Sequence, residues 1–138
     1  MLSETPALNE KEDLMGATRG YYSLIQYCPD LSKAESVNVG VLLFCPEAKF
    51  IDARTSSENS RVRKFFGPGT FDPVRLQAAK KAIEARLRVC RDDFRTVEDL
   101  NHFIDTRANE LLITPPRPMK VLNPEAALDA LFKELACE

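Results

Sequence analysis

The sequence lacks the features that mark membrane, secreted and uniformly basic proteins. Its longest apolar stretch, Val39 to Cys45, is far shorter than the roughly 20 residues of a membrane-spanning helix. Its 19 basic and 21 acidic side chains leave a net charge of −2, which excludes a uniformly basic coat for nucleic acid. The N-terminus shows no charged segment, apolar segment and cleavage site in succession. We therefore predict a cytoplasmic protein without a membrane span.

Motifs for catalysis, cofactors and metals are also missing. No P-loop, G-x-G-x-x-G or G-x-S-x-G motif occurs. The single imidazole, His102, has no carboxylate cluster at ligand spacing beside it. A thiol nucleophile would need Cys28, Cys45 or Cys90 to meet His102 in space, which sequence alone does not show. We predict no catalytic residue, no metal and no cofactor, and we favour a protein that is not an enzyme.

The four cysteines are widely spread and form no C-x-x-C pair, which argues against a zinc ribbon or a thioredoxin-like motif. An even number of cysteines would permit two disulfides, but without a secretion signal we favour reduced thiols. Cys28-Pro29 and Cys45-Pro46 each end an apolar run. If these runs pair as an antiparallel hairpin, the two cysteines lie at opposite ends of the sheet, beyond the roughly 7 Å that a disulfide bridges.

The apolar pattern predicts strands first and helices after them. Hydrophobic residues make up 44% of the chain, enough for a packed core. We expect a disordered N-terminal arm over residues 1–17 and a single domain over residues 18–138. The predicted strands form a three-stranded antiparallel meander and cover Gly20 to Cys28, Val37 to Cys45 and Phe50 to Thr55. The second strand is apolar on nearly both faces, so it is expected at the centre of the sheet.

Helical spacing dominates the rest of the chain. Asp72 is a predicted N-cap for a helix from Pro73 to about Arg91, with Lys80 and Glu84 lying away from its apolar stripe. Further helices are expected over residues 58–66, after Thr96, and after Asn123. Residues 110–114 and 119–122 look extended, and the prolines between them cannot sit in a central strand. The order of elements predicts an α+β fold, an antiparallel sheet covered on one face by three or four helices.

Charge is concentrated in the middle of the chain. Residues 61–95 carry a net charge of +6, whereas residues 1–60 and residues 96–138 each carry −4. The basic segment, which begins with Arg61, Arg63 and Lys64, could bind nucleic acid, a phosphate ligand or an acidic partner. Alternatively, it neutralises the acidic flanks when the chain folds, and we favour this interpretation.

A second candidate site surrounds a glycine in the predicted central strand. Glycine inside an apolar strand is typical of a bulge or of a close backbone approach. Glu35, Asn38 and Gly40 could form a polar pocket with Asp52 and Arg54 of the next strand. The alternative, which we favour, is that Gly40 makes room for an aromatic side chain such as Tyr22.

Two stretches of this sequence resemble a bacterial family known only as a domain of unknown function. They are YYSLIQYCPD from Tyr21, followed by Glu35, NVGV from Asn38 and FCP from Phe44, and the later TPPRP from Thr114. The resemblance covers residues 20 to 136 and points to Arg117 as a further candidate binding residue. It implies a neighbouring kinase similar to HipA toxins, and hence a protein partner in a toxin–antitoxin setting. We therefore predict an accessory interaction protein of undetermined oligomeric state, with a nucleic-acid or phosphate binder as the alternative.

Overall fold

A computed structural model describes residues 17–29, 31–33, 35–67, 69, 71–105 and 111–136. The predicted disordered arm therefore lies outside the described residues, apart from Ala17. Among the helices described, none combines the length and the apolar character needed to cross a bilayer.

The strands of the sheet are β1 (Thr18–Tyr27), β2 (Val37–Cys45), β3 (Phe50–Thr55), β4 (Leu111–Ile113) and β5 (Arg117–Val121). The strand order is β3-β2-β1-β4, and all pairings are antiparallel. β5 and β4 share one edge of β1: β5 pairs with its first half and β4 with its C-terminal end. The predicted meander is confirmed, and the two extended segments complete its outer edge. Pro118 lies in β5 at this edge, where a missing N–H interrupts no central ladder.

The helices are α2 (Ser60–Phe66), α3 (Pro73–Val89), α4 (Val97–Asp105) and α5 (Pro124–Leu135). Short 3₁₀ turns lie between other elements: η2 (Leu31–Lys33), η3 (Pro46–Ala48) and η4 (Arg91–Asp93). The predicted caps are confirmed. The Asp72 carboxylate accepts from two N–H groups of α3, and the Asn123 side chain accepts from Ala126 of α5. Thr96 and Asp99 bond reciprocally at the start of α4.

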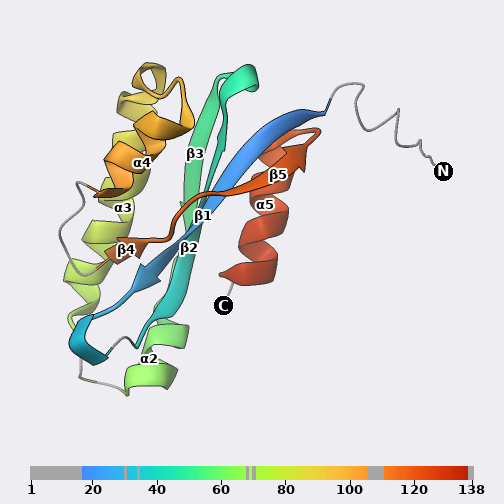
Figure 1. Ribbon diagram of the computed structural model, residues 1–138. Coiled ribbons are helices and arrows are strands. Elements are labelled where there is room, and N and C mark those ends of the chain that lie inside the picture. The colour runs from blue at the N-terminus through green and yellow to red at the C-terminus, as the bar shows by residue number, and fades with distance from the viewer. Residues whose placement is uncertain are drawn as a thin grey trace.

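Helices cover both faces of the sheet, not one face as the sequence analysis expected. The α+β class itself is confirmed. Helices α3 and α4 lie on one side of the sheet and α5 on the other (Figure 1). The physical reason is the central strand β2, which is apolar on both sides and would expose one side to water without α5. Val41, Leu43 and Cys45 pack with Leu128 of α5 in this second core.

A bulge in β2 changes which side chains share a face. Ile25 of β1 pairs with Gly40, but the next residue, Gln26, pairs with Asn38, so Val39 is the extra residue. Strict alternation would have placed Val39 and Val41 on the same face. Because of the bulge, Val39 packs under α3 and α4, whereas Val41 faces α5.

Gly40 is required by a close approach of the next strand. A Cβ atom at this position would lie 2.7 Å from the carbonyl oxygen of Arg54 and 2.9 Å from Cγ2 of Thr55. The prediction of a bulge or a close approach at Gly40 is therefore confirmed. The expectation that Tyr22 fills the space is wrong, because the neighbour is the backbone of β3.

Candidate functional site

Two of the predicted site residues converge on the C-terminal end of α5. The side-chain amide of Asn38 donates to the carbonyl oxygen of Leu135 at 3.2 Å, and Arg61 donates to the same oxygen at 3.3 Å. Gln26 in turn donates to Asn38 at 2.8 Å. Asn38 and Arg61 both donate to a carbonyl of the last turn of α5, which has no hydrogen-bond partner within the helix. Asn38 and Arg61 thus fix α5 against the sheet.

Beyond Arg61, helix α2 presents three neighbouring exposed side chains, which we call the α2 surface: Arg63, Lys64 and Phe65. Phe65 has 56% of its surface exposed and is the aromatic member of the exposed large apolar side chains described, with Val74, Val89 and Leu122. Its ring packs edge-on against Phe66 at 4.8 Å, and Phe66 packs edge-on against the buried Tyr27 at 5.6 Å. Such edge-to-face pairs hold Phe65 in place. The α2 surface is therefore a fixed aromatic ring beside two cations.

The side chains of the other residues predicted for the polar pocket have separate partners, although the backbone of Arg54 lies against Gly40. Arg54 pairs with Asp129 of α5 at 2.8 Å, and Asp52 pairs with Arg88 of α3 at 3.4 Å. Glu35 is exposed in the loop before β2, and Arg117 is exposed on β5. Within the described part of the chain, no hydrogen bond or ion pair joins these residues to Asn38. The contacts that the structure gives them are thus separate.

The basic segment is partly used inside the fold and partly divided between two ends of the molecule. Lys81 and Arg88 pair with carboxylates, and Lys80 is fully buried. Arg63 and Lys64 lie on α2, at the end of the sheet where Tyr27 meets Val37. Arg91 and Arg95 lie beside the β2–β3 turn, at the opposite end (Figure 1). At about 3.3 Å per residue, the nine residues of β2 separate these ends by roughly 25 Å.

The buried network around Lys80 was missed from the sequence, which placed this side chain away from the core. Its ammonium group donates to four acceptors in the loop before α2. They are the carbonyl oxygen of Ser56 at 3.1 Å, its hydroxyl at 2.9 Å, the carbonyl of Glu58 at 3.2 Å and the side chain of Asn59 at 2.8 Å. Asn59 stands at the N-cap of α2 but makes no side-chain cap bond, since its oxygen accepts from Lys80.

Glu84 was also placed outside the core by the sequence analysis, and the structure corrects this. It is buried one turn after Lys80, and its carboxylate accepts from the N–H of Thr55 at 2.9 Å and from the Thr55 hydroxyl at 2.7 Å. Asp52 similarly accepts from the N–H of Ala53 at 2.8 Å. These carboxylates accept from N–H groups of β3, which is an edge strand of the sheet. Fewer N–H groups of β3 are therefore left to pair with a strand of another chain.

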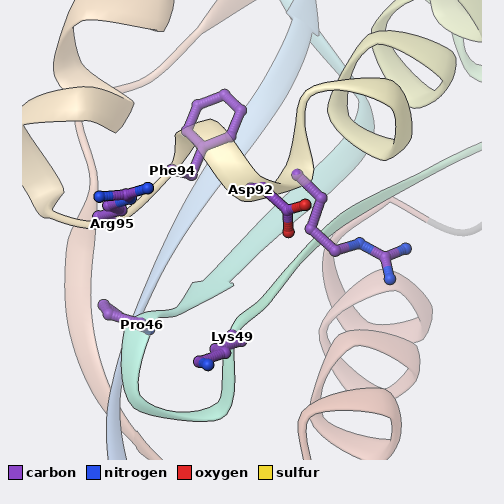
Figure 2. A pocket seen from close by; sticks show the side chains of 6 residues that line it. Pro46, Lys49, Asp92, Phe94 and Arg95 are labelled. Carbon is purple, nitrogen blue, oxygen red and sulfur yellow. The ribbon is translucent and has the colours of Figure 1, made fainter.

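A hollow of about 520 Å³, which we call the basic hollow, lies at the end of the molecule opposite α2. Figure 2 shows it between the β2–β3 turn, which carries Pro46 and Lys49, and the segment after α3, which carries Asp92, Phe94 and Arg95. Arg91 also lines it. Three cations against one carboxylate give the lining a net charge of +2. Arg91 and Arg95 come from the basic segment, whereas no pattern in the sequence predicted that Lys49 lines the same hollow.

A neighbouring hollow of about 490 Å³ brings Cys90 and His102 to one lining, together with Arg86 and Asp99. A thiol nucleophile would need the imidazole within hydrogen-bond reach, and no hydrogen bond joins the two side chains in the described structure. Two backbone N–H groups, of Arg95 first and then of Thr96, hold the pKa of Asp99 below its ordinary value. No group of three metal-ligating side chains occurs among the residues described.

The described cysteines form no disulfide, as the sequence analysis predicted. Cys28 follows the end of β1 beside Val37, whereas Cys45 lies at the other end of β2. Burial raises the pKa of the Cys45 thiol from 9.0 to about 11, because the thiolate would lose its hydration among the apolar side chains facing α5. Cys45 is therefore a structural thiol at neutral pH.

Comparison with known proteins gives a family for this chain. Residues 22–136 match the family described as protein of unknown function (DUF3037). The chain belongs to this family. The DUF3037 match begins within β1 and contains all the strands and helices described after it, through α5, so most of the sheet and both of its helical layers are parts of the family domain. No curated protein and no solved structure shows significant similarity to it.

Proposed function

We propose that this DUF3037 protein is a cytoplasmic accessory protein without catalytic chemistry of its own, and that it binds a partner protein through the α2 surface. The observation that carries this proposal is the fixed, half-exposed ring of Phe65 beside Arg63 and Lys64. Aromatic and arginine side chains dominate the binding energy of protein interfaces when they enter a desolvated pocket of the partner.

The chemistry of the α2 surface defines the partner that would fit it. Phe65 requires an apolar pocket on the partner, and Arg63 and Lys64 favour carboxylates around that pocket. The ring is already held by Phe66, so little side-chain entropy would be lost on binding. A kinase similar to HipA toxins, which the family resemblance implies as a neighbour, is the first candidate. The chain would then act as a partner or regulator of that kinase.

The test is co-expression with the kinase-like neighbour, followed by size-exclusion chromatography and titration calorimetry. We expect a stable complex, and we expect Phe65→Ala to weaken it by about 30-fold or more, the loss typical of a central aromatic anchor of about 2 kcal/mol. Replacing Arg63 and Lys64 together by Glu should also weaken it. The matched control is Val89→Ala, because Val89 is an exposed apolar residue outside the α2 surface.

Two results would argue against this proposal. One is the absence of any complex with the kinase-like neighbour under conditions where both proteins are folded. The other is a complex that tolerates both Phe65→Ala and the double charge reversal, since the interface would then lie elsewhere. Circular dichroism of each variant establishes that the fold is retained.

A nucleic-acid binder is the second candidate, because an exposed ring beside cations is also a platform on which bases stack. Arg63 and Lys64 would then contact two phosphates of a single strand. Two contacts predict a slope of about −1.4 for the logarithm of the binding constant against the logarithm of salt concentration. A flat salt response, or no binding of a single-stranded oligonucleotide at low salt, would remove this candidate.

A further inference from the structure

We propose that the basic hollow is a second binding site, and that it takes the phosphate group of a small molecule, free or esterified. This inference is independent of the proposed partner surface, because the hollow lies at the other end of the sheet, beside the β2–β3 turn (Figure 1). Its volume of about 520 Å³ falls within the range of ordinary small-molecule sites.

The charges of the hollow match a dianion. Lys49, Arg91 and Arg95 oppose one carboxylate, Asp92, and a phosphomonoester carries a charge of about −2 at neutral pH. No salt bridge joins any of the three cations to a carboxylate in the ranges that the structure describes. The charge of Arg95 does contribute, as the smallest of several causes, to the lowered pKa of Asp99. The positive lining is thus not neutralised by ion pairs of the protein.

Both segments that carry the cations have a fixed backbone. Lys49 adopts the left-handed region, with φ 53° and ψ 42°, and its N–H donates to the carbonyl of Pro46 at 3.0 Å. This conformation is uncommon for a residue other than glycine, asparagine or aspartate. The N–H of Arg95 donates to Asp99 at 2.9 Å. The cations therefore project from turns that are already ordered, which lowers the entropic cost of binding.

The ring of Phe94 is already packed against core side chains, so we infer that charge, and not stacking of a ligand on this ring, is the means by which the hollow recognises a phosphate group. The Phe94 ring points away from Lys49 and packs edge-on against Phe44 and Phe103 of the core (Figure 2). The ring thus anchors the segment that carries Asp92 and Arg95. Pro46 and Phe94 give the lining apolar surface, and Lys49, Arg91, Asp92 and Arg95 supply its charged groups. Guanidinium groups donate in a fork that suits phosphate oxygens, and an ammonium group adds a point charge.

The test titrates inorganic phosphate, and in parallel glycerol phosphate, at constant ionic strength into the isotopically labelled full chain. Backbone amide shifts and calorimetry are the readouts. We expect both probes to shift the amides of Lys49, Asp92 and Arg95. Binding of phosphate alone would identify free phosphate as the ligand, whereas binding of both would identify the dianionic group in either form. If neither probe moves these amides, the site does not exist.

Four variants separate a defined site from a diffuse positive field. Lys49→Asn suits the left-handed backbone and should weaken phosphate binding about fivefold, as should Arg95→Gln. Asp92→Asn should tighten it by a similar factor, because it removes the one negative charge of the hollow. Lys64→Gln removes an equal charge at the far end and should change the affinity less than twofold. An equal effect of Lys64→Gln and Lys49→Asn, or weaker binding in Asp92→Asn, would overturn the proposal.

Discussion

Replacing Lys80 by methionine tests the network that ties α3 to the loop before α2. Methionine has a similar length and apolar stem but no donor, so it fills the space and removes all four hydrogen bonds of the ammonium group. The loop acceptors then lose the lysine donor at buried positions, because Ser56 and Asn59 are only 2% and 8% exposed. We expect the loop and the start of α2 to loosen before the sheet does.

The size of the effect follows from which acceptors stay buried. The Ser56 hydroxyl still donates to the carbonyl of Glu58 at 3.1 Å, so the carbonyl of Ser56 and the side chain of Asn59 are the buried acceptors that lose a donor, and an unsatisfied buried acceptor costs about 1–3 kcal/mol. The exposed Glu58 can turn its carbonyl to water. Two effects oppose the loss: the variant buries no charge, and the Asn59 side chain becomes available to cap α2. We therefore predict a net loss of about 3 kcal/mol in the free energy of unfolding, a fall in Tm of about 10 °C.

Urea denaturation followed by circular dichroism measures the loss, and amide hydrogen exchange locates it. The control is Lys120→Met, because Lys120 is an exposed lysine of β5, and this variant should change the free energy of unfolding by less than about 0.5 kcal/mol. Exchange should increase at residues 56–60 and not in β1. A loss below about 1 kcal/mol for Lys80→Met would refute the reasoning, because it would mean that the four bonds contribute little beyond what methionine packing restores.

Two further substitutions test the second core and the bulge. Burial raises the pKa of the Cys45 thiol from 9.0 to about 11 in the folded state. The contribution of this shift to the free energy of unfolding is complete below pH 9. It is lost progressively up to about pH 11 and amounts to about 2–3 kcal/mol. Cys45→Ala should flatten the fall in the free energy of unfolding between pH 8 and 10.5, and an unchanged slope would contradict this. Gly40→Ala places a Cβ 2.7 Å from the Arg54 carbonyl and should destabilise the protein by about 1–3 kcal/mol. An unchanged urea midpoint would show that β3 can move away freely.

Local sequence signals were sufficient for the parts of the fold that depend on neighbouring residues. Asp72, Thr96 with Asp99, and Asn123 each cap a helix within three residues of their own position, so the pattern alone identified them. The first three strands were predicted close to their observed bounds for the same reason. The apolar character of β2 on both sides also signalled two covered faces. One helical layer was nevertheless expected, although a strand that is apolar on both sides requires cover on both.

Features that depend on two distant segments could not be predicted. Gly40 signalled a bulge, but the shift in face at Val39 is set by the register with β1. Lys80 follows the helical pattern of a solvated residue, and only the position of the loop at Ser56 makes it buried. Nor does spacing along the chain show that the β2–β3 turn, which carries Lys49, and the segment that carries Arg95 line one hollow.

The central strand gives the two proposed surfaces their independence. β2 is buried on both faces along most of its length, paired on both edges, and runs from the end that contacts α2 to the turn at the basic hollow. Such a strand keeps the two ends about 25 Å apart, well beyond the Debye length of about 8 Å at physiological ionic strength. The cations of one surface therefore contribute little to the potential at the other. Loss of partner binding in Phe65→Ala and loss of phosphate binding in Lys49→Asn should for this reason occur separately, and each variant serves as the folded control for the other.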